Sequence, residues 1–355
     1  MLGGVTVPTT DSAMYQTMHR QPDDLRRLLD SGWDAAEEAA RRLAGAARVY
    51  IVGIGTSYHA ALVGAWLMRA VGVDARAVTS FDFSVYPEFF ALRRDDAVVV
   101  MAHSGVKTYS TRSLDRAAAV GATRISIGSL TAVHEGSQQV LRTVERERSA
   151  AFTASHVAAM TILAQIAIRV GHASGLESAL AELPDRVAEV LAREDEIRPV
   201  AVEAARRRVY AIGAGPNEAT ALEAVIKVRE AAQGWIDALA AEQFLHGPLI
   251  AVNLDDVVVI VNASGAAASE RLAEIARVLD GVGARLWLIG VPIDGLQTRP
   301  RVFELPELPE VLSPLLAVVP VQLFAYHMAV EKGINPDVFR RDDARYAAAL
   351  GVLQL

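Results

Sequence analysis

The chain has 355 residues, of which 52% are hydrophobic and 22% charged, a balance typical of a folded protein with large buried cores rather than a disordered one. Its 42 acidic side chains outnumber its 35 basic ones, and the net charge of −7 opposes binding to nucleic acid or another polyanion. Cysteine is absent, which excludes disulfides, thiolate metal sites, iron–sulfur clusters and cysteine nucleophiles within this sequence.

The first 45 residues predict an amphipathic helical lead-in, with Asp23 and Asp24 in the first helical turn. They contain no basic segment followed by an apolar stretch, so we expect no secretory signal and a cytoplasmic location. Two long uncharged stretches, 149–168 and 311–330, have the length of membrane spans. Polar residues interrupt both, and Pro320 lies in the middle of the second. This pattern favours helices buried in a protein core over helices in a bilayer.

Two segments recur along the chain. Residues 48–55, RVYIVGIG, reappear as RVYAIGAG at 208–215, and residues 95–105, DDAVVVMAHSG, reappear as DDVVVIVNASG at 255–265. Both pairs are shifted by 160 residues, from 48 to 208 and from 95 to 255. A common shift for two separate segments indicates a tandem duplication.

Each repeat alternates strands and helices. The predicted strands are 49–52, 98–102 and 123–127 in the first repeat and 209–212, 257–261 and 285–289 in the second. The first two strands of the first repeat lead into predicted helices at about 57–71 and 113–120. This alternation predicts an α/β fold in which each repeat forms a parallel sheet with helices on both faces.

The predicted organisation has five parts. They are an N-terminal helical lead-in (1–45), a first domain (46–175), a charged helical connector (176–206), a second domain (207–333) and a C-terminal tail (334–355).

Two turns of the first repeat follow predicted strands and are rich in small and hydroxyl-bearing residues. They read Gly-Thr-Ser at 55–57 and His-Ser-Gly-Val-Lys-Thr at 103–108. Ligands of open parallel sheets bind beyond the carboxyl ends of the strands, where helix-start amides and hydroxyls suit a phosphate. Alternatively, these residues only cap the helices. No third glycine completes a dinucleotide-binding motif. The second repeat has lost most of these hydroxyls, so we predict one phosphate site per chain, in the first repeat.

A charged helix face is predicted in the second repeat. Glu223, Lys227 and Glu230 are spaced i, i+4 and i+7, so they lie on one face. A solvated stripe is one interpretation, but the run 219–228 is too apolar for an exposed helix and favours a role in acid–base chemistry. His246 precedes Gly-Pro in a predicted loop, where a single histidine is more often structural than catalytic.

These segments resemble a known family. The motif Gly-Thr-Ser-Tyr-His at 55–59, the helix around 222–230 and the motif Phe-Leu-His-Gly-Pro at 244–248 are similar to those of tandem sugar-isomerase (SIS) domain proteins. Within this family the chain resembles the isomerase half of glucosamine-6-phosphate synthase over nearly its whole length. The family includes phosphosugar isomerases, hexosamine-phosphate deaminases and fructosamine-phosphate deglycases. The resemblance implies two flavodoxin-like domains, a tail over the active site, and a homodimer with its sites near the subunit interface.

The resemblance also implies roles for individual residues. The sugar-phosphate site would consist of Gly55, Thr56, Ser57, His103, Ser104, Gly105, Lys107, Thr108 and Thr153. Glu230 matches the carboxylate that moves a proton between C1 and C2 of the open-chain sugar, and Lys227 matches the lysine that assists it. His246 matches a histidine associated with ring opening, which the family typically contributes from the partner subunit. No metal or redox cofactor is implied, because phosphate binding positions the reacting carbons.

Three departures from the family pattern stand out. The family's Ser-Gln-Ser-Gly-Glu-Thr turn reads AHSGVKT at 102–108, which loses a hydroxyl and adds Lys107, either a phosphate partner or a solvated side chain. The third phosphate loop, usually Ser-Thr-Lys, reads Phe-Thr-Ala at 152–154. Ala344 and Arg345 occupy the region of the synthase's tail lysine. Because arginine stays protonated, we expect no tail residue to form an imine with the sugar.

The sequence therefore predicts an isomerase- or aminotransferase-type enzyme acting on a hexose or hexosamine 6-phosphate, without a glutaminase domain. Whether ammonia is added or removed at C2 stays open. One alternative is a fructosamine-phosphate deglycase, and another is a non-catalytic phosphosugar-binding or regulatory protein. The departures favour the binding protein, whereas the retained lysine and carboxylate favour the enzyme. The expected partners are a sugar phosphate and a second copy of the chain, with no nucleic acid and no membrane.

Overall fold

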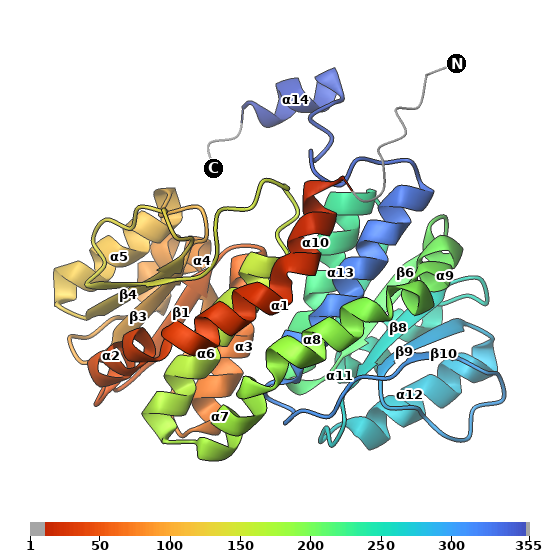
Figure 1. Cartoon of the computed structure of the whole chain (residues 1–355), viewed down its shortest axis with the longest axis horizontal. Coiled ribbons are helices and arrows are strands. Elements are labelled where there is room, and N and C mark those ends of the chain that lie inside the picture. Colours follow the sequence, from red (N-terminus) through yellow and green to blue (C-terminus); the bar gives the residue numbers. More distant parts are fainter. Residues whose placement is uncertain (1–10, 353–355) are drawn as a thin grey trace. The chain divides into compact units, whose positions relative to one another are not determined.

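A computed structural model describes residues 11–352, and these divide into two compact units. Residues 20–147 and 154–184 form what we call the first unit, and residues 11–19, 148–153 and 185–352 form the second unit. Each unit contains one five-stranded parallel sheet with helices on both faces (Figure 1). The first ten residues of the expected lead-in and the last three of the expected tail lie outside the described residues.

The first unit contains the first repeat. Its strands are β1 (Val49–Gly53), β2 (Ala75–Thr79), β3 (Ala97–Met101), β4 (Thr123–Gly128) and β5 (Gln139–Arg142), in the order β2-β1-β3-β4-β5. Helices α2 (Trp33–Leu43), α3 (Thr56–Ala70) and α6 (Ala154–Gly171) pack together on one face. The other face carries α4 (Ser80–Val85) and α5 (Thr108–Val120). The short helices η1 (Pro87–Phe89) and α7 (Ser174–Ala181) complete this unit.

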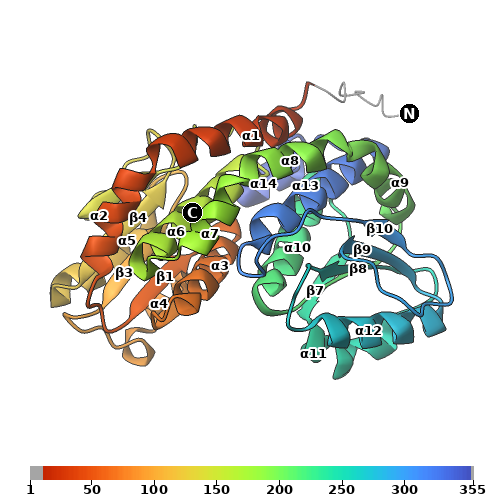
Figure 2. The ribbon, with the colours of Figure 1, turned by 60° about the horizontal axis from the view of Figure 1, so that its bottom comes forward.

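The second unit repeats this arrangement. Its strands are β6 (Val209–Gly213), β7 (Ile236–Ala240), β8 (Val257–Asn262), β9 (Arg285–Gly290) and β10 (Arg301–Phe303), in the order β10-β9-β8-β6-β7. One face carries α9 (Glu194–Ala204), α10 (Glu218–Ala232) and α13 (Ser313–Glu331), and the other α11 (Ala241–Leu245) and α12 (Ser269–Val282) (Figure 2). The remaining elements are α8 (Leu183–Ala192), η2 (Gly215–Asn217), η3 (Pro248–Ala251) and α14 (Ala344–Leu350). The helix α1 (Ala13–Ser31) contributes its first seven residues to this unit.

The central strands explain why the sequence predicts their position well. Every residue of β1, β3, β6 and β8 is buried, because both sheet faces are covered by helices. The strands β2, β5, β7 and β10 were not predicted, because they are short, partly exposed and carry polar residues. The predicted fold of two parallel sheets flanked by helices is nevertheless confirmed.

The duplication extends to side-chain contacts. Arg48, just before β1, pairs with Asp96, just before β3, with 2.7 Å between Nη2 and Oδ2. Arg208 and Asp256 repeat this pair in the second unit at 2.9 Å. In both units the aspartate also accepts a hydrogen bond from the backbone amide three residues earlier. The same brace thus ties the starts of the two central strands in each repeat.

Two local expectations need correction. Asp23 and Asp24 lie in the middle of α1 rather than in a first helical turn, because the helix already begins at Ala13. The predicted helix 113–120 begins earlier, at Thr108, directly after the turn that follows β3. The connector consists of successive helices, with Pro184 in the first turn of α8, a position where proline is tolerated.

Both long uncharged stretches form helices, α6 and α13. By length and composition each could cross a membrane, but 78% of the most apolar window of α6 and 94% of that of α13 are buried within the structure. Helices at the centre of a folded core have the same composition, so these two carry only weak evidence for a membrane.

Candidate functional site

The two turns of the first repeat lie at the same edge of their sheet. β1 and β3 are adjacent and parallel, so residues 55–57 and 104–108 both follow the carboxyl ends of neighbouring strands. The chain leaves these turns on opposite faces, into α3 and α5. This is the topological switch point at which open α/β sheets bind ligands. We call residues 55–57 and 104–108 the first-repeat turns.

The first-repeat turns present unengaged hydroxyls. Gly55 (φ 59°) and Gly105 (φ 100°) adopt backbone conformations that side chains disfavour. A Cβ on Gly105 would lie 3.0 Å from the Val133 carbonyl oxygen, so the turn also needs a residue without a side chain. Within the described residues the hydroxyls of Ser57, Ser104 and Thr108 make no hydrogen bond. These hydroxyls and the first amides of α3 and α5 are suited to a phosphate.

Lys107 adds a cation to these turns. Its backbone is fixed, because its N–H donates to the Ser110 hydroxyl at 2.8 Å and that hydroxyl donates back to its carbonyl at 3.0 Å. The side chain is exposed, and its ammonium forms no ion pair with any residue in 11–352. Lys107 can therefore follow a phosphate bound at the start of α5.

Two buried imidazoles lie beside the second turn. Burial lowers the pKa of His103 to about 4, and the nearby Arg146 and His134 act in the same direction. Burial also lowers the pKa of His134 to about 4, with a further contribution from Arg142. A Cβ on Gly128, at the end of β4, would collide with the His134 ring, so glycine makes room for it. His134 was not predicted, because a loop histidine outside any motif carries no signal until the fold brings it to the strand ends.

The charged face of α10 is buried, as its apolar surroundings predict. Lys227 is completely buried, and its Nζ lies 2.9 Å from Glu230 Oε2 and 3.4 Å from Glu223 Oε1. Glu223 is also completely buried, whereas the Glu230 side chain is 30% exposed. A buried ammonium requires such partners, since an unpaired one would be strongly destabilising. Of the two carboxylates, Glu230 is therefore the one that a ligand can reach.

His246 lies apart from that cluster in its recorded contacts. It follows α11 directly, and its side chain is 69% exposed. Its Nε2 lies 3.3 Å from Glu242 Oε1, and Glu242 is in turn held by Arg271, with both contacts at 2.9 Å. An imidazole this exposed is available to a ligand or to another chain.

Thr153 belongs to the second unit and lies just before α6. It is fully buried, and its carbonyl oxygen accepts a hydrogen bond from the Gln322 side chain of α13 at 3.3 Å. Nearby, the Ala150 amide donates to the Asp337 carbonyl at 3.1 Å. The carboxylate of Asp337 accepts from the first amides of α1 at 2.8 and 2.9 Å. The loop with Thr153 is thus fastened to α13 and to the start of the tail.

The tail offers few groups for chemistry. Lys332 donates to the Gln233 carbonyl at 3.0 Å, and burial lowers its pKa. Arg345 pairs with Asp343 at 3.0 Å. Within residues 11–352 no group of three histidine, aspartate or glutamate side chains is arranged to hold a metal ion.

The predicted site residues therefore fall into two sets. The first-repeat turns and the histidine beside them belong to the first unit. Lys227, Glu230, His246 and Thr153 belong to the second unit, where only Lys227 and Glu230 have a recorded contact with each other.

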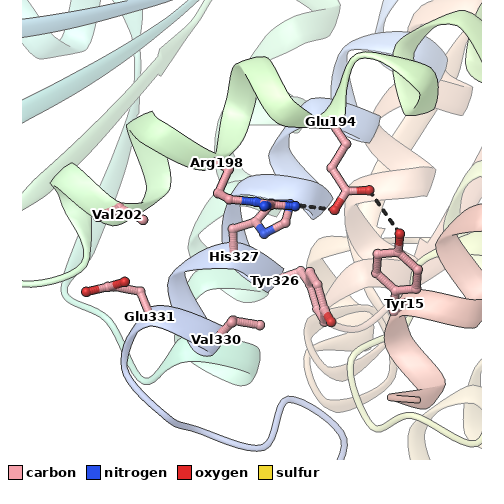
Figure 3. A pocket seen from close by; sticks show the side chains of 8 residues that line it. All are labelled: Tyr15, Glu194, Arg198, Val202, Tyr326, His327, Val330 and Glu331. Carbon is pink, nitrogen blue, oxygen red and sulfur yellow. Dashed lines mark hydrogen bonds and ion pairs between the residues drawn. The ribbon is translucent and has the colours of Figure 1, made fainter. Parts of the chain in front are cut away.

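A second cluster of titratable groups was not predicted. Glu194 on α9 accepts hydrogen bonds from Tyr15 at 3.2 Å and pairs with His327 of α13 at 2.7 Å and His19 of α1 at 3.2 Å (Figure 3). Burial raises the pKa of Glu194, but the hydrogen bonds from the two histidines outweigh it and hold that pKa well below its ordinary value. The cluster borders a cavity of about 190 Å³. Its residues come from three distant parts of the sequence, so no local pattern reveals it.

Comparison with known proteins gives this geometry a family context. The family model for the SIS domain matches residues 42–169 and 204–332. The glutamine–fructose-6-phosphate aminotransferase (isomerizing) of Pyrococcus horikoshii is 29% identical over 334 residues, which cover 91% of this chain and 56% of that protein. The chain thus spans about half the length of the curated relatives it matches.

Solved structures show the same fold. The C-terminal domain of glucosamine-fructose-6-phosphate aminotransferase from Francisella tularensis matches with a TM-score of 0.81 and 18% identity, covering 91% of this chain and 97% of that one. Tagatose-6-phosphate ketose/aldose isomerase from Escherichia coli matches with a TM-score of 0.79 and 18% identity, covering 94% and 97%. At these identities the likeness concerns the fold alone.

Proposed function

Because the chain belongs to the SIS domain family, we propose that it is a phosphosugar isomerase-type enzyme that acts on a hexose or hexosamine 6-phosphate. In this proposal the first-repeat turns bind the phosphate and α10 supplies the acid–base group. The observation that carries it is the fully buried Lys227, which contacts the partly exposed Glu230 at 2.9 Å. A binding site that only holds a neutral sugar has no need of this costly pair.

The division of roles follows from the contacts. The Ser57, Ser104 and Thr108 hydroxyls and the Lys107 ammonium anchor the phosphate, with His103, Thr153 and the backbone of Gly55, Thr56 and Gly105 shaping the site. Phosphate binding energy then positions the reacting carbons, although the phosphate itself takes no part in the reaction.

Glu230 moves the proton in this account. Its carboxylate takes a proton from one carbon of the open-chain sugar and returns it to the neighbouring carbon, through an enediol or, with an amino sugar, an enolamine. Lys227 keeps Glu230 in place and keeps it charged before the transfer. The proton then rests on the Glu230 oxygen, so the charges balance within the site.

His246 assists ring opening and acts in the active site of a second copy of the chain. Its high exposure supports this assignment, because an imidazole with a single glutamate contact can reach into a neighbouring molecule. The proposed assembly is accordingly a homodimer. The aminotransferase step of the longer relatives, with nitrogen added or removed at C2, and the deglycase reaction are finer alternatives within the same chemistry.

A phosphosugar-binding protein without catalysis is the second candidate. The tail supports it, since Ala344 and Arg345 stand where the synthase has a lysine, and Arg345 is engaged by Asp343. The buried pair on α10 opposes it.

A panel of hexose, hexosamine and fructosamine 6-phosphates separates the candidates. Thermal shift identifies the compounds that bind, and NMR of the same mixtures identifies those that are converted. We expect at least one compound both to raise the melting temperature and to be converted. Binding without conversion across the panel would contradict the enzyme and support the binding protein.

A further inference from the structure

The second repeat contains a counterpart of the first-repeat turns. β6 and β8 are adjacent and parallel, like β1 and β3, and residues 213–217 and 263–267 follow their carboxyl ends. The shift of 160 residues places these segments opposite 53–57 and 103–107. Gly215 (φ 55°) and Gly265 (φ 65°) repeat the positive φ angles of the two glycines in the first repeat. We call residues 213–217 and 263–267 the second-repeat turns.

A third loop also has its counterpart. The same shift places residues 308–313, which precede α13, opposite 148–153, which precede α6, so that Ser313 corresponds to Thr153. In the second unit this loop is fixed to the turn after β6. The buried Asn217, which corresponds to Ser57, donates from Nδ2 to Ser313 Oγ at 2.7 Å. Ser313 Oγ in turn donates to the Glu310 carbonyl at 2.7 Å, which fixes the backbone of Glu310 beside both turns.

The Glu310 side chain reaches the second-repeat turns. Its Oε2 accepts a hydrogen bond at 3.2 Å from the Ala267 amide, two residues before the start of α12. Its Oε1 lies 3.5 Å from the point that a Cβ on Gly215 would occupy. One carboxylate therefore contacts the turn after β8 and lies beside the turn after β6, while its own backbone belongs to the third loop. All three segments that correspond to the proposed phosphate site converge on it.

The two repeats differ in charge at this place. Glu310 corresponds to Ala150 in the first repeat, and Ala267 corresponds to Lys107. The first repeat thus has a cation and hydroxyls where an anion would bind, whereas the second has an anionic side chain and lacks the cation. A carboxylate near the first amides of a helix has the favourable electrostatics of a bound phosphate.

We propose that the second-repeat turns form an anion site of the same kind, which the Glu310 carboxylate fills in place of a phosphate monoester. The proposal rests on the proposed function in that the first-repeat turns bind phosphate. It has a specific consequence: the chain binds one sugar phosphate, and removal of the internal carboxylate opens a second site for inorganic phosphate or a phosphate monoester. Glu310 also acts as a lock that holds the third loop of the second unit.

The test compares Glu310→Ala with Glu307→Ala, a change of the same kind at an exposed glutamate in the same segment. Both are made in the full chain and in a Ser57→Ala/Ser104→Ala background that lacks the proposed first site. The melting temperature is measured with and without millimolar inorganic phosphate, and the phosphate bound per chain is counted by equilibrium dialysis.

We expect Glu310→Ala to melt about 2–4 °C below the parent, and phosphate to restore part of that loss in both backgrounds. Dialysis should find one additional phosphate per chain in Glu310→Ala and none in Glu307→Ala. Glu310→Asp, which shortens the side chain but keeps its charge, serves if the alanine variant does not fold, and it too should be stabilised by phosphate more than the parent.

The outcomes distinguish this proposal from the proposed function. If Glu310→Ala behaves like Glu307→Ala and gains no phosphate, the internal anion is refuted, whereas phosphate binding by the parent still supports the first site. If the parent binds no phosphate but Glu310→Ala binds one, the proposed function fails at its anchor and the internal anion stands.

Discussion

The helices that follow the first turn of each repeat, α3 and α10, have the same fold but opposite character. When their starts are aligned, Glu223, Lys227 and Glu230 of α10 fall opposite Ala61, Ala65 and Met68 of α3. The α3 residues are almost completely buried, as expected for a helix packed on a sheet. The turns show the reverse, because the hydroxyls before α3 and α5 have largely disappeared before α10 and α12.

This difference indicates that the duplicated units have divided binding and chemistry between them. A buried lysine between two carboxylates is usually no more stable than the apolar residues that α3 has at those positions. Its presence on α10 therefore argues for a role other than stability. The structure accordingly predicts that changes in the first-repeat turns affect binding and changes on α10 affect turnover.

The largest expected effect is that of Glu230→Gln. The amide keeps the shape and can still accept from Lys227, but it cannot take a proton, so we expect turnover to fall by about 10²–10⁴-fold with little change in binding. Steady-state kinetics on the substrate found in the panel measures both. Glu218→Gln, at the exposed start of the same helix, is the control and should retain its activity. Full activity in Glu230→Gln would remove the acid–base role from α10.

The next effect concerns binding and compares the two repeats directly. Ser57→Ala/Ser104→Ala should weaken sugar-phosphate binding by about 1–3 kcal/mol, or about 5- to 150-fold in Kd. Ser264→Ala, the counterpart of Ser104 in the second repeat, should leave the Kd unchanged. Isothermal titration calorimetry measures all three chains. An equal loss in Ser264→Ala would mean that the repeats share the binding of phosphate.

A smaller, pH-dependent effect is expected at the Glu194 cluster. Its hydrogen bonds hold the pKa of Glu194 below the ordinary value of 4.5, so its contribution is present above pH 4.5 and is lost as the pH falls further. The hydrogen bond to Glu194 raises the pKa of His19 above 6.5, so that contribution is present below pH 6.5 and is lost as the pH rises through the folded value.

Glu194→Gln should therefore destabilise the chain most between pH 4.5 and 6.5, by about 1–3 kcal/mol, and less on either side of this range. Urea unfolding of the variant and the parent at several pH values measures the difference. Glu189→Gln, a change of the same kind at an exposed residue of α8, is the control. A difference in stability that does not depend on pH would contradict the ionic character of the cluster.

The last prediction concerns covalent chemistry, where no effect is expected in the tail. Borohydride reduction in the presence of each ketose phosphate, followed by peptide mass mapping, should find no sugar adduct on a tail residue. Lys332 is engaged by the Gln233 carbonyl, and Arg345 stays protonated. An adduct on Lys332 would overturn this prediction, whereas an adduct on Lys227 would move covalent chemistry to α10.

The sequence predicts those features that depend on local pattern. Fully buried strands such as β3 read as runs of β-branched residues, and the shift of 160 residues reveals the duplication. The spacing of Glu223, Lys227 and Glu230 gives their common face, and the apolar residues around them indicate burial. The hydroxyls of the first-repeat turns are likewise visible as motifs at strand ends.

Features that depend on contacts between distant segments escape such reading. The Glu194 cluster joins α1, α9 and α13, and His134 is brought to the strand ends only by the path of its loop. Glu310 lies in a segment without a motif, and only its hydrogen bond to Ala267 draws attention to it. The edge strand β5, with four partly polar residues, gains its conformation from pairing with β4 rather than from its own sequence.

The central claim, that Glu230 moves a proton on a sugar anchored by the first repeat, is tested most directly by deuterium exchange. Because the Glu230 side chain is partly exposed, a proton that it takes from the sugar can exchange with solvent. In D₂O, NMR should show the wild-type chain introducing deuterium next to the carbonyl carbon of its substrate. Glu230→Gln should bind the same sugar phosphate equally well but introduce deuterium about 10²–10⁴-fold more slowly. Equal rates of deuterium incorporation in the two chains would contradict the account.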